Sequence, residues 1–171
     1  MKRLIIIPFS LALALSIFLF FRVGPVAANS EREIFQWVQK EMGADSSYTM
    51  PEFRFVSKER LQELFRKDNE RSFQKWADQM GNNQAQKMMK MYLTELIGLY
   101  SPATGEVYVG KFLDPCRKEA VLAHEFAHHI QVMEEGDIDV TLYNAEYEIM
   151  FREMQAKSIE MKYLETFCPG P

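Results

Sequence analysis

Two histidines and one glutamate in this chain have the types and spacing of a metal-dependent site. They lie in the run His124-Glu125-Phe126-Ala127-His128. Residues four apart on a helix share a face, so both imidazoles can reach one Zn²⁺ at about 2.0–2.1 Å. Glu125 is turned by about 100° from His124 and can instead take a proton from a water molecule beside the ion. The spacing therefore predicts two metal ligands, His124 and His128, and one general base, Glu125.

The alternative is a solvated helix on which the histidines share no function. All three histidines of the chain fall at positions 124, 128 and 129. Most of their neighbours are small or apolar, namely Val121, Leu122, Ala123, Phe126, Ala127 and Ile130. A helix that is apolar around most of its circumference is buried, and buried histidines and carboxylates need polar partners. A metal ion supplies those partners, so we favour the metal site.

A catalytic zinc site needs one more protein ligand, and Glu134 is the first candidate. It lies ten residues after His124, where metzincin peptidases place a third histidine. That family turns its chain at a glycine seven residues after the first histidine. Here Gln131 occupies that position and continues the helix, so we discount Glu134.

The second source of a ligand is the last long helix. If the two helices form an antiparallel pair hinged near residues 138–139, residue 126 lies level with residue 151. Glu153 is then about 3 Å from that level, and Glu148 is slightly further away. These two glutamates are about 140° apart around the helix, so only one of them can face the metal. Their positions along the helix axis therefore leave both Glu153 and Glu148 open as the third ligand.

The run His124-Glu125-Phe126-Ala127-His128, followed by Arg152-Glu153-Met154-Gln155-Ala156, resembles the gluzincin clan of zinc metallopeptidases. It is most similar to small members whose fold is little more than the active-site helices and an edge strand. The resemblance covers about the last sixty residues. It implies that Glu153 is the third ligand and that one Zn²⁺ is the cofactor.

The chain departs from the clan at Lys157, where many relatives have an aspartate that orients a histidine ligand. Such an acceptor fixes the tautomer and ring orientation of the ligand. We expect Glu146, Glu160 or a backbone carbonyl to take this role.

Together these residues predict a zinc-dependent hydrolase, most simply a metallopeptidase that cleaves a peptide or protein substrate with Glu125 as general base. Two other functions stay open: a non-catalytic zinc-stabilised binding domain, and an amidase that acts on a non-peptide substrate such as a cell-wall component. Extended peptides bind beside an edge strand, and residues 107–109 are either that edge or part of a purely structural hairpin. Tyr143, Tyr147 and His129 are candidate donors to the oxyanion.

The first 28 residues predict export. Lys2 and Arg3 precede an uncharged apolar run over residues 4–21, and Val26-Ala27-Ala28 offers the small residues that a signal peptidase accepts. Residues 1–28 are therefore expected to be a signal peptide, or an N-terminal membrane anchor if residues 4–21 remain attached. Both alternatives place the domain in the periplasm or the extracellular space.

The remaining residues, 29–171, contain no repeat or low-complexity linker and are expected to form one zincin-like domain, acting as a monomer. Without Lys2, Arg3 and Arg22, 17 of the 20 basic residues remain against 24 acidic ones. An acidic domain without a basic cluster argues against nucleic-acid binding.

The two cysteines, Cys116 and Cys168, are expected to form a disulfide in an oxidising compartment. Cys116 lies in the first turn of the motif helix and Cys168 lies just after the last helix. A bond between them would join the ends of the two helices that carry the ligands.

Periodicity and end signals predict an α+β fold, mostly helical, with a small antiparallel sheet packed on the motif helix. Helices are expected over about 31–42, 57–65, 72–96 with a break near 81, 115–135 and 141–167, a strand over 53–56, and a hairpin of 97–100 with 107–109. The motif helix has the strongest signals, with Asp114 as cap, Pro115 at its first position and Gly136 after its end.

Overall fold

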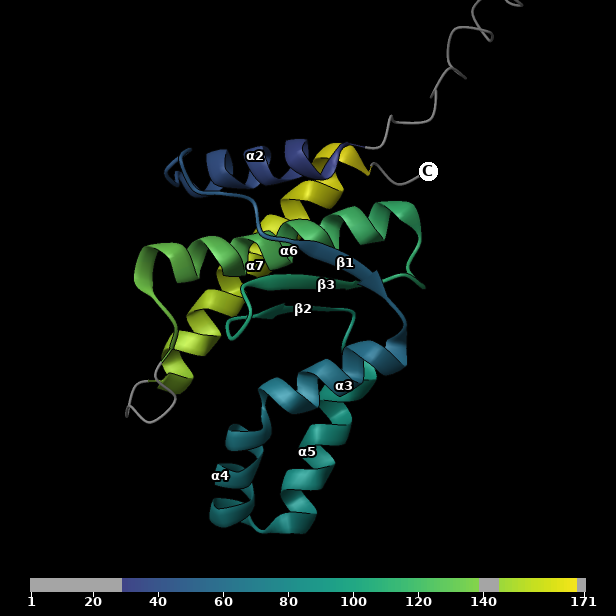
Figure 1. The fold of residues 1–171 in the computed structure, drawn as a ribbon, viewed down its shortest axis with the longest axis vertical. Helices are drawn as coiled ribbons and strands as arrows, with labels where there is room; N and C mark the ends of the chain where they lie inside the picture. The colour runs from purple at the N-terminus through teal and green to yellow at the C-terminus, as the bar shows by residue number, and fades with distance from the viewer. Residues whose placement is uncertain (1–28, 139–144, 169–171) are drawn as a thin grey trace, which may run out of the picture.

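The computed structural model describes residues 29–138 and 145–168 of the chain (Figure 1). Its elements are α2 (Glu31–Met42), β1 (Phe53–Val56), α3 (Lys58–Asp68), α4 (Glu70–Met80), α5 (Asn82–Glu95), β2 (Gly98–Ser101), β3 (Glu106–Gly110), α6 (Pro115–Glu135) and α7 (Ala145–Phe167). Most of the chain is helical and one small sheet is present, which confirms the predicted α+β class. The predicted signal segment, 1–28, and Tyr143 lie outside the described residues. No helix within the described ranges has the length and apolar character needed to cross a membrane.

Local capping signals set the ends of the helices. The Ser30 side chain accepts from the amide of Glu33, and the Glu33 carboxylate accepts in return from the amide of Ser30 at 2.8 Å. The Asp114 carboxylate accepts from the amide of Arg117 at 2.9 Å, and Pro115 fills a first-turn position that needs no amide donor. The predicted bounds of α2 and α6 are confirmed.

Helix α3 ends later than predicted and α4 begins earlier. Asn69 alone separates α3 from α4, and its amide and its side chain both donate to the carbonyl of Phe65 at 3.0 Å, which closes α3. The predicted break near residue 81 is confirmed, because Gly81 has a φ of 86° and ends α4.

The sheet is mixed, with the strand order β1-β3-β2. β2 and β3 form the predicted antiparallel hairpin, but β1 pairs with β3 in parallel. The amide of Val107 donates to the carbonyl of Glu52 at 2.8 Å, so this side of β3 is occupied. Of the two alternatives for residues 107–109, the free edge is therefore wrong, and the strand belongs to a structural hairpin. Among the described strands, β1 and β2 are the edges.

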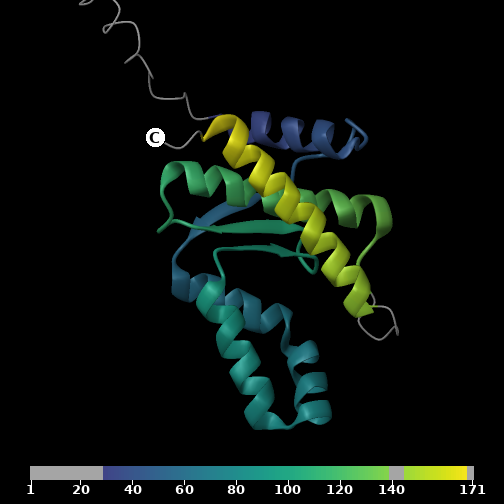
Figure 2. The ribbon, with the colours of Figure 1, turned by 180° about the vertical axis from the view of Figure 1, so that it is seen from behind.

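Helix α6 lies at the centre of the molecule. In Figure 1 the sheet lies on one side of α6 and α2 on the other, and Figure 2 shows α7 running diagonally across it. Phe126 of α6 packs edge-on against Phe35 of α2, with ring centroids 5.2 Å apart, and against Phe53 of β1 at 6.4 Å. This enclosure explains why the motif helix is apolar on most sides.

The helices α3, α4 and α5 form a helical lobe, residues 58–95, on the face of the sheet away from α6 (Figure 1). Leu61 and Leu64 of α3 pack with Tyr108 of β3 in a separate apolar cluster, and Leu99 of β2 lies at its margin. Because side chains alternate along a strand, the neighbours of Leu99 and Tyr108 face α6 instead.

Cys116 and Cys168 form the predicted disulfide, with Cα atoms 6.0 Å apart. The bond joins the first turn of α6 to the residue after α7 and closes a loop with a sequence separation of 52. It fixes the two helices to each other at the end opposite to their connection.

The double variant Cys116→Ser/Cys168→Ser removes this cross-link. A loop of this size stabilises a fold by about 4 kcal/mol in the chain-entropy account, within a usual range of about 2–5 kcal/mol. We expect a loss of that order in the free energy of unfolding, measured by urea denaturation. Dithiothreitol should destabilise the wild type similarly and leave the double variant unchanged. Equal unfolding midpoints of wild type and variant would contradict the stabilising role.

Candidate metal centre

The two motif histidines lie on the face of α6 that meets α7. Their Nε2 atoms are 3.1 Å apart, and their rings are inclined at 77° with centroids 4.8 Å apart. Both side chains are only partly buried, at 16% and 17% exposed, although the residues between them are mostly buried. The helical spacing of His124 and His128 therefore turns two ring nitrogens toward one accessible point.

Glu153 of α7 brings a carboxylate to the same point. Its Oε1 lies 3.3 Å from Nε2 of His128, and its Oε2 lies 3.6 Å from Nε2 of His124. One ligand atom from each of the three residues lies within 4.8 Å of the others. Glu148 turns elsewhere and pairs with Arg152 at 2.7 Å, and Glu134 is an exposed residue outside this group.

The spacing of these donor atoms fits a tetrahedral ion. Two ligands at 2.0–2.1 Å on a tetrahedral centre are about 3.3 Å from each other. The two imidazole nitrogens are 3.1 Å apart, and each of them has a different oxygen of the Glu153 carboxylate close to that distance, at 3.3 Å from His128 and 3.6 Å from His124. Two imidazole nitrogens and one carboxylate are a usual set of protein ligands for catalytic zinc, with a fourth position left for water.

The electrostatics of the group favour positive charge. Burial alone would lower the pKa of His124, but hydrogen bonding to Glu153 and Glu160 outweighs it and raises the pKa to about 10. Hydrogen bonding to His124 and His128 lowers the pKa of the Glu153 carboxyl. A site that holds a proton this strongly next to ionised carboxylates is suited to a divalent cation in its place.

Glu160 brings a carboxylate next to His124, in the role that was expected of an acid at position 157. Its Oε2 lies 3.3 Å from Nδ1 of His124, and its side chain is 4% exposed. Lys157 contacts the same Oε2 at 2.8 Å, and Arg117 contacts Oε1 at 2.8 Å. Lys157 therefore holds the orienting acid in place, although it cannot itself be that acid. The side chain of Glu146, the other predicted candidate, lies outside the described part of the chain.

Gln131 orients the second histidine, a role that the sequence analysis missed. Its amide nitrogen donates to the carbonyl of Arg152 at 3.0 Å and to Oε1 of Gln155 at 2.8 Å. The amide oxygen consequently faces Nδ1 of His128 as an acceptor at 2.9 Å. Nδ1 then carries the proton, and the lone pair of Nε2 is free for a metal. In the sequence, only its position three residues after His128, on the same face of the helix, could have indicated this role.

Glu125 lies beneath the free edge of β2 and is 6% exposed. Burial raises the pKa of its carboxyl, against the opposing effect of His124 and His128, and the amide of Tyr100 donates a hydrogen bond to it. A Cβ on Gly98 would lie 2.3 Å from Oε1 of Glu125. The missing side chain at Gly98 thus makes room for the carboxylate between strand and helix.

The candidate oxyanion donors lie elsewhere or are exposed. Nε2 of His129 hydrogen-bonds the carbonyl of Thr49 at 3.0 Å, its ring packs against Tyr100 with centroids 5.6 Å apart, and burial lowers its pKa. His129 is a core residue that fixes the chain before β1. Tyr147 is 69% exposed near the start of α7.

Comparisons of the chain with family models, with curated proteins and with solved structures found no match. The function of the site is therefore inferred from its geometry and chemistry.

The ligand set predicts which glutamate on α7 is needed for metal binding. Glu153→Ala should retain almost no zinc after dialysis, against about one equivalent in the wild type, because two histidines alone leave the site incomplete. Glu148→Ala is the matched control and should keep its zinc, since Glu148 faces Arg152. Elemental analysis by mass spectrometry measures both, with circular dichroism as the check of folding. Full zinc content in Glu153→Ala would exclude this ligand set.

Glu160 predicts a pH dependence of stability in the metal-free protein. Burial would raise its pKa, but hydrogen bonding to His124 and Lys157 and the charges of Lys157 and Arg117 lower it from 4.5 to about 2. A lowered folded-state pKa stabilises the fold above about pH 4.5, and this contribution is lost as the pH falls toward 2.

Glu160→Gln should therefore lower the free energy of unfolding by about 3 kcal/mol at pH 7, because it removes the buried carboxylate that pairs with Arg117 and Lys157 and lies beside His124. The difference from the wild type should shrink below pH 4.5 in urea denaturation. Glu165→Gln, an exposed site on the same helix, should differ from the wild type by less than about 0.5 kcal/mol. A constant difference across the pH range would refute the role of the Glu160 charge.

Proposed function

We propose that this protein is a zinc-dependent hydrolase of the gluzincin type, and most specifically a metallopeptidase. One observation carries the proposal. His124 and His128 of α6 and Glu153 of α7 present ligand atoms within 4.8 Å of one another, and the buried carboxylate of Glu125 lies on the adjacent face of α6. This combination of three ligands and a separate carboxylate is the arrangement that metal-assisted hydrolysis requires.

Bound zinc would polarise the scissile carbonyl and lower the pKa of a water molecule. Glu125 acts as the general base, since its carboxylate accepts the proton of the attacking water and later delivers it to the leaving amine. Burial raises the pKa of Glu125, which makes the carboxylate a better proton acceptor. The Tyr100 amide and the space at Gly98 hold that carboxylate in one position.

The free edge of β2 offers a place for an extended peptide. The amide of Gly110 in β3 donates to the carbonyl of Ile97, so the main-chain groups of β2 point alternately toward β3 and away from it. By this alternation the main-chain groups of Gly98 and Tyr100 point to the free edge, where the Tyr100 amide is taken by Glu125 and the Gly98 groups and the Tyr100 carbonyl are left for a substrate. A substrate strand paired there would lie beside the catalytic carboxylate and the metal ligands.

The disulfide supports placing this activity in an oxidising compartment, in line with export directed by residues 1–28. We propose a periplasmic or extracellular enzyme acting on peptide or protein substrates.

The mechanism is tested with Glu125→Gln, which keeps the size of the side chain and removes its basicity. We expect casein cleavage to fall by about 10²-fold or more, with zinc content unchanged. Glu134→Gln, an exposed position on the same helix, should keep full activity.

The cleavage assay also distinguishes the peptidase from the two other functions, the non-catalytic binding domain and the amidase. Casein cleavage that survives Glu125→Gln would refute Glu125 as general base. Zinc retention without cleavage of casein or of cell-wall fragments would favour the non-catalytic binding domain. Cleavage of cell-wall fragments alone, lost in Glu125→Gln, would favour the amidase.

A further inference from the structure

The helical lobe contains a cavity that is separate from the metal centre. It lies among α3, α4 and α5 and has a volume of about 790 Å³. Sites for small molecules usually measure about 300–1,000 Å³. None of the residues that line it belongs to the metal centre or to the strand edge beside Glu125.

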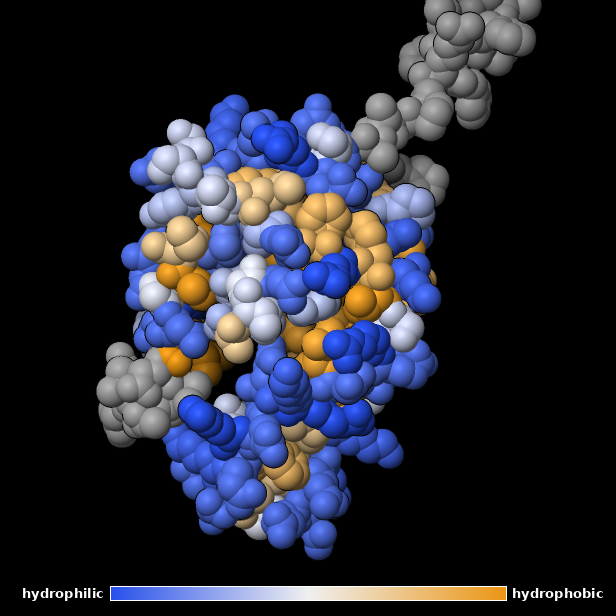
Figure 3. Space-filling view, in the orientation of Figure 1, coloured by the Kyte–Doolittle hydropathy of each residue, from blue (hydrophilic) through white to orange (hydrophobic). Residues whose placement is uncertain are grey.

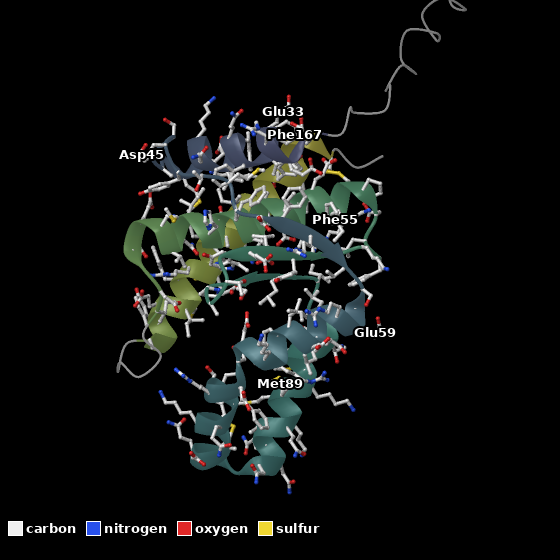
Figure 4. The ribbon with its side chains drawn as sticks, viewed as in Figure 1. Glu33, Asp45, Phe55, Glu59, Met89 and Phe167 are labelled. Atoms are coloured by element: carbon white, nitrogen blue, oxygen red, sulfur yellow. A yellow bond between two sulfur atoms is a disulfide. The ribbon has the colours of Figure 1, made fainter. Side chains whose placement is uncertain are left out.

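The inner surface of this cavity is apolar. Phe73 of α4 and Met89 and Leu93 of α5 line it, and the last two are 9% and 6% exposed. Figure 4 labels Met89 among the helices of the lobe, and Figure 3 shows apolar side chains of the lobe between hydrophilic ones. Such a surface, with a flexible methionine, suits an apolar chain.

Three cations lie around the opening of the cavity. Arg66 and Lys67 of α3 and Lys90 of α5 are exposed, and in the described chain none of them has an ion-pair partner. Glu70 is the one carboxylate among the lining residues. The opening therefore carries an excess of positive charge that the protein itself does not neutralise.

The walls are fixed to each other by a polar bond. The side-chain amide of Gln62 donates to the carbonyl of Leu93 at 2.9 Å and ties α3 to α5. The cavity thus combines an apolar lining from α4 and α5 with cations from α3 and α5.

We propose that this cavity binds a single-chain amphiphile with an anionic head group, either a long-chain carboxylate or an alkyl phosphate. The alkyl chain lies against Phe73, Met89 and Leu93, where its burial is favourable. The head group lies between Arg66 and Lys90, where charge-assisted hydrogen bonds replace the missing partners. This assignment goes beyond the proposed hydrolase activity and does not depend on it.

Isothermal titration of the full chain with dodecanoate, below its critical micelle concentration, tests the assignment. We expect one molecule to bind, and dodecyltrimethylammonium, with the same chain and the opposite charge, to bind at least about tenfold more weakly. Lys90→Glu should weaken dodecanoate binding by about tenfold. Lys87→Glu makes the same charge change on the same helix outside the cavity and should leave binding unchanged. Dodecyl phosphate in place of dodecanoate identifies which head group is preferred.

Equal binding of the two dodecyl compounds, or equal weakening by Lys90→Glu and Lys87→Glu, would overturn the proposal, because either result indicates unspecific apolar or charge effects. Both variants keep residues 1–28, so any binding to that segment is common to them. A dimer by light scattering that Lys90→Glu dissociates would also overturn it, by assigning the cavity to a second copy of the chain.

Discussion

The packing of α7 across α6 is the interaction on which the candidate site depends. Glu153 meets His124 and His128 only because the two helices lie at one particular offset along their axes, and a slip of one turn, about 5.4 Å, would remove the carboxylate from reach. Several contacts hold that offset. Arg117 pairs with Glu160 near one end at 2.8 Å, and Gln131 donates to Gln155 near the other at 2.8 Å. The fully buried Ala156 sits between them, where a small side chain permits close approach of the helices.

Much of α6 could be predicted because its signals are local. A cap, a proline and a terminal glycine set its length, and the four-residue spacing sets which side chains share a face. The offset of α7 was predicted less well. A hinge near residues 138–139 places residue 151 opposite the motif, yet Glu160 lies 3.3 Å from His124 and Gln155 lies opposite Gln131. The pairing is therefore shifted toward the C-terminal end of α7.

The order of the sheet could not be derived from neighbouring residues, since β1 is separated from β3 by the whole helical lobe. One signal was nevertheless present: Val107, Tyr108 and Val109 are three consecutive apolar residues, and all are buried. A run without polar alternation is typical of a central strand covered on both faces. Glu160 was among the predicted partners of a histidine ligand, but Gln131 was not, because its orientation depends on contacts with another helix.

The disulfide between Cys116 and Cys168 makes a closed covalent ring of the chain from one cysteine to the other. The three candidate metal ligands, His124, His128 and Glu153, lie inside this ring. A protease that cuts one peptide bond within it opens the ring but releases neither fragment, so the ligands stay tethered at high effective concentration. Separating the candidate ligands by proteolysis consequently requires two reactions, hydrolysis of a peptide bond and reduction of the disulfide. In an oxidising space the second event is rare, so a single nick in this ring leaves the parts of the centre joined.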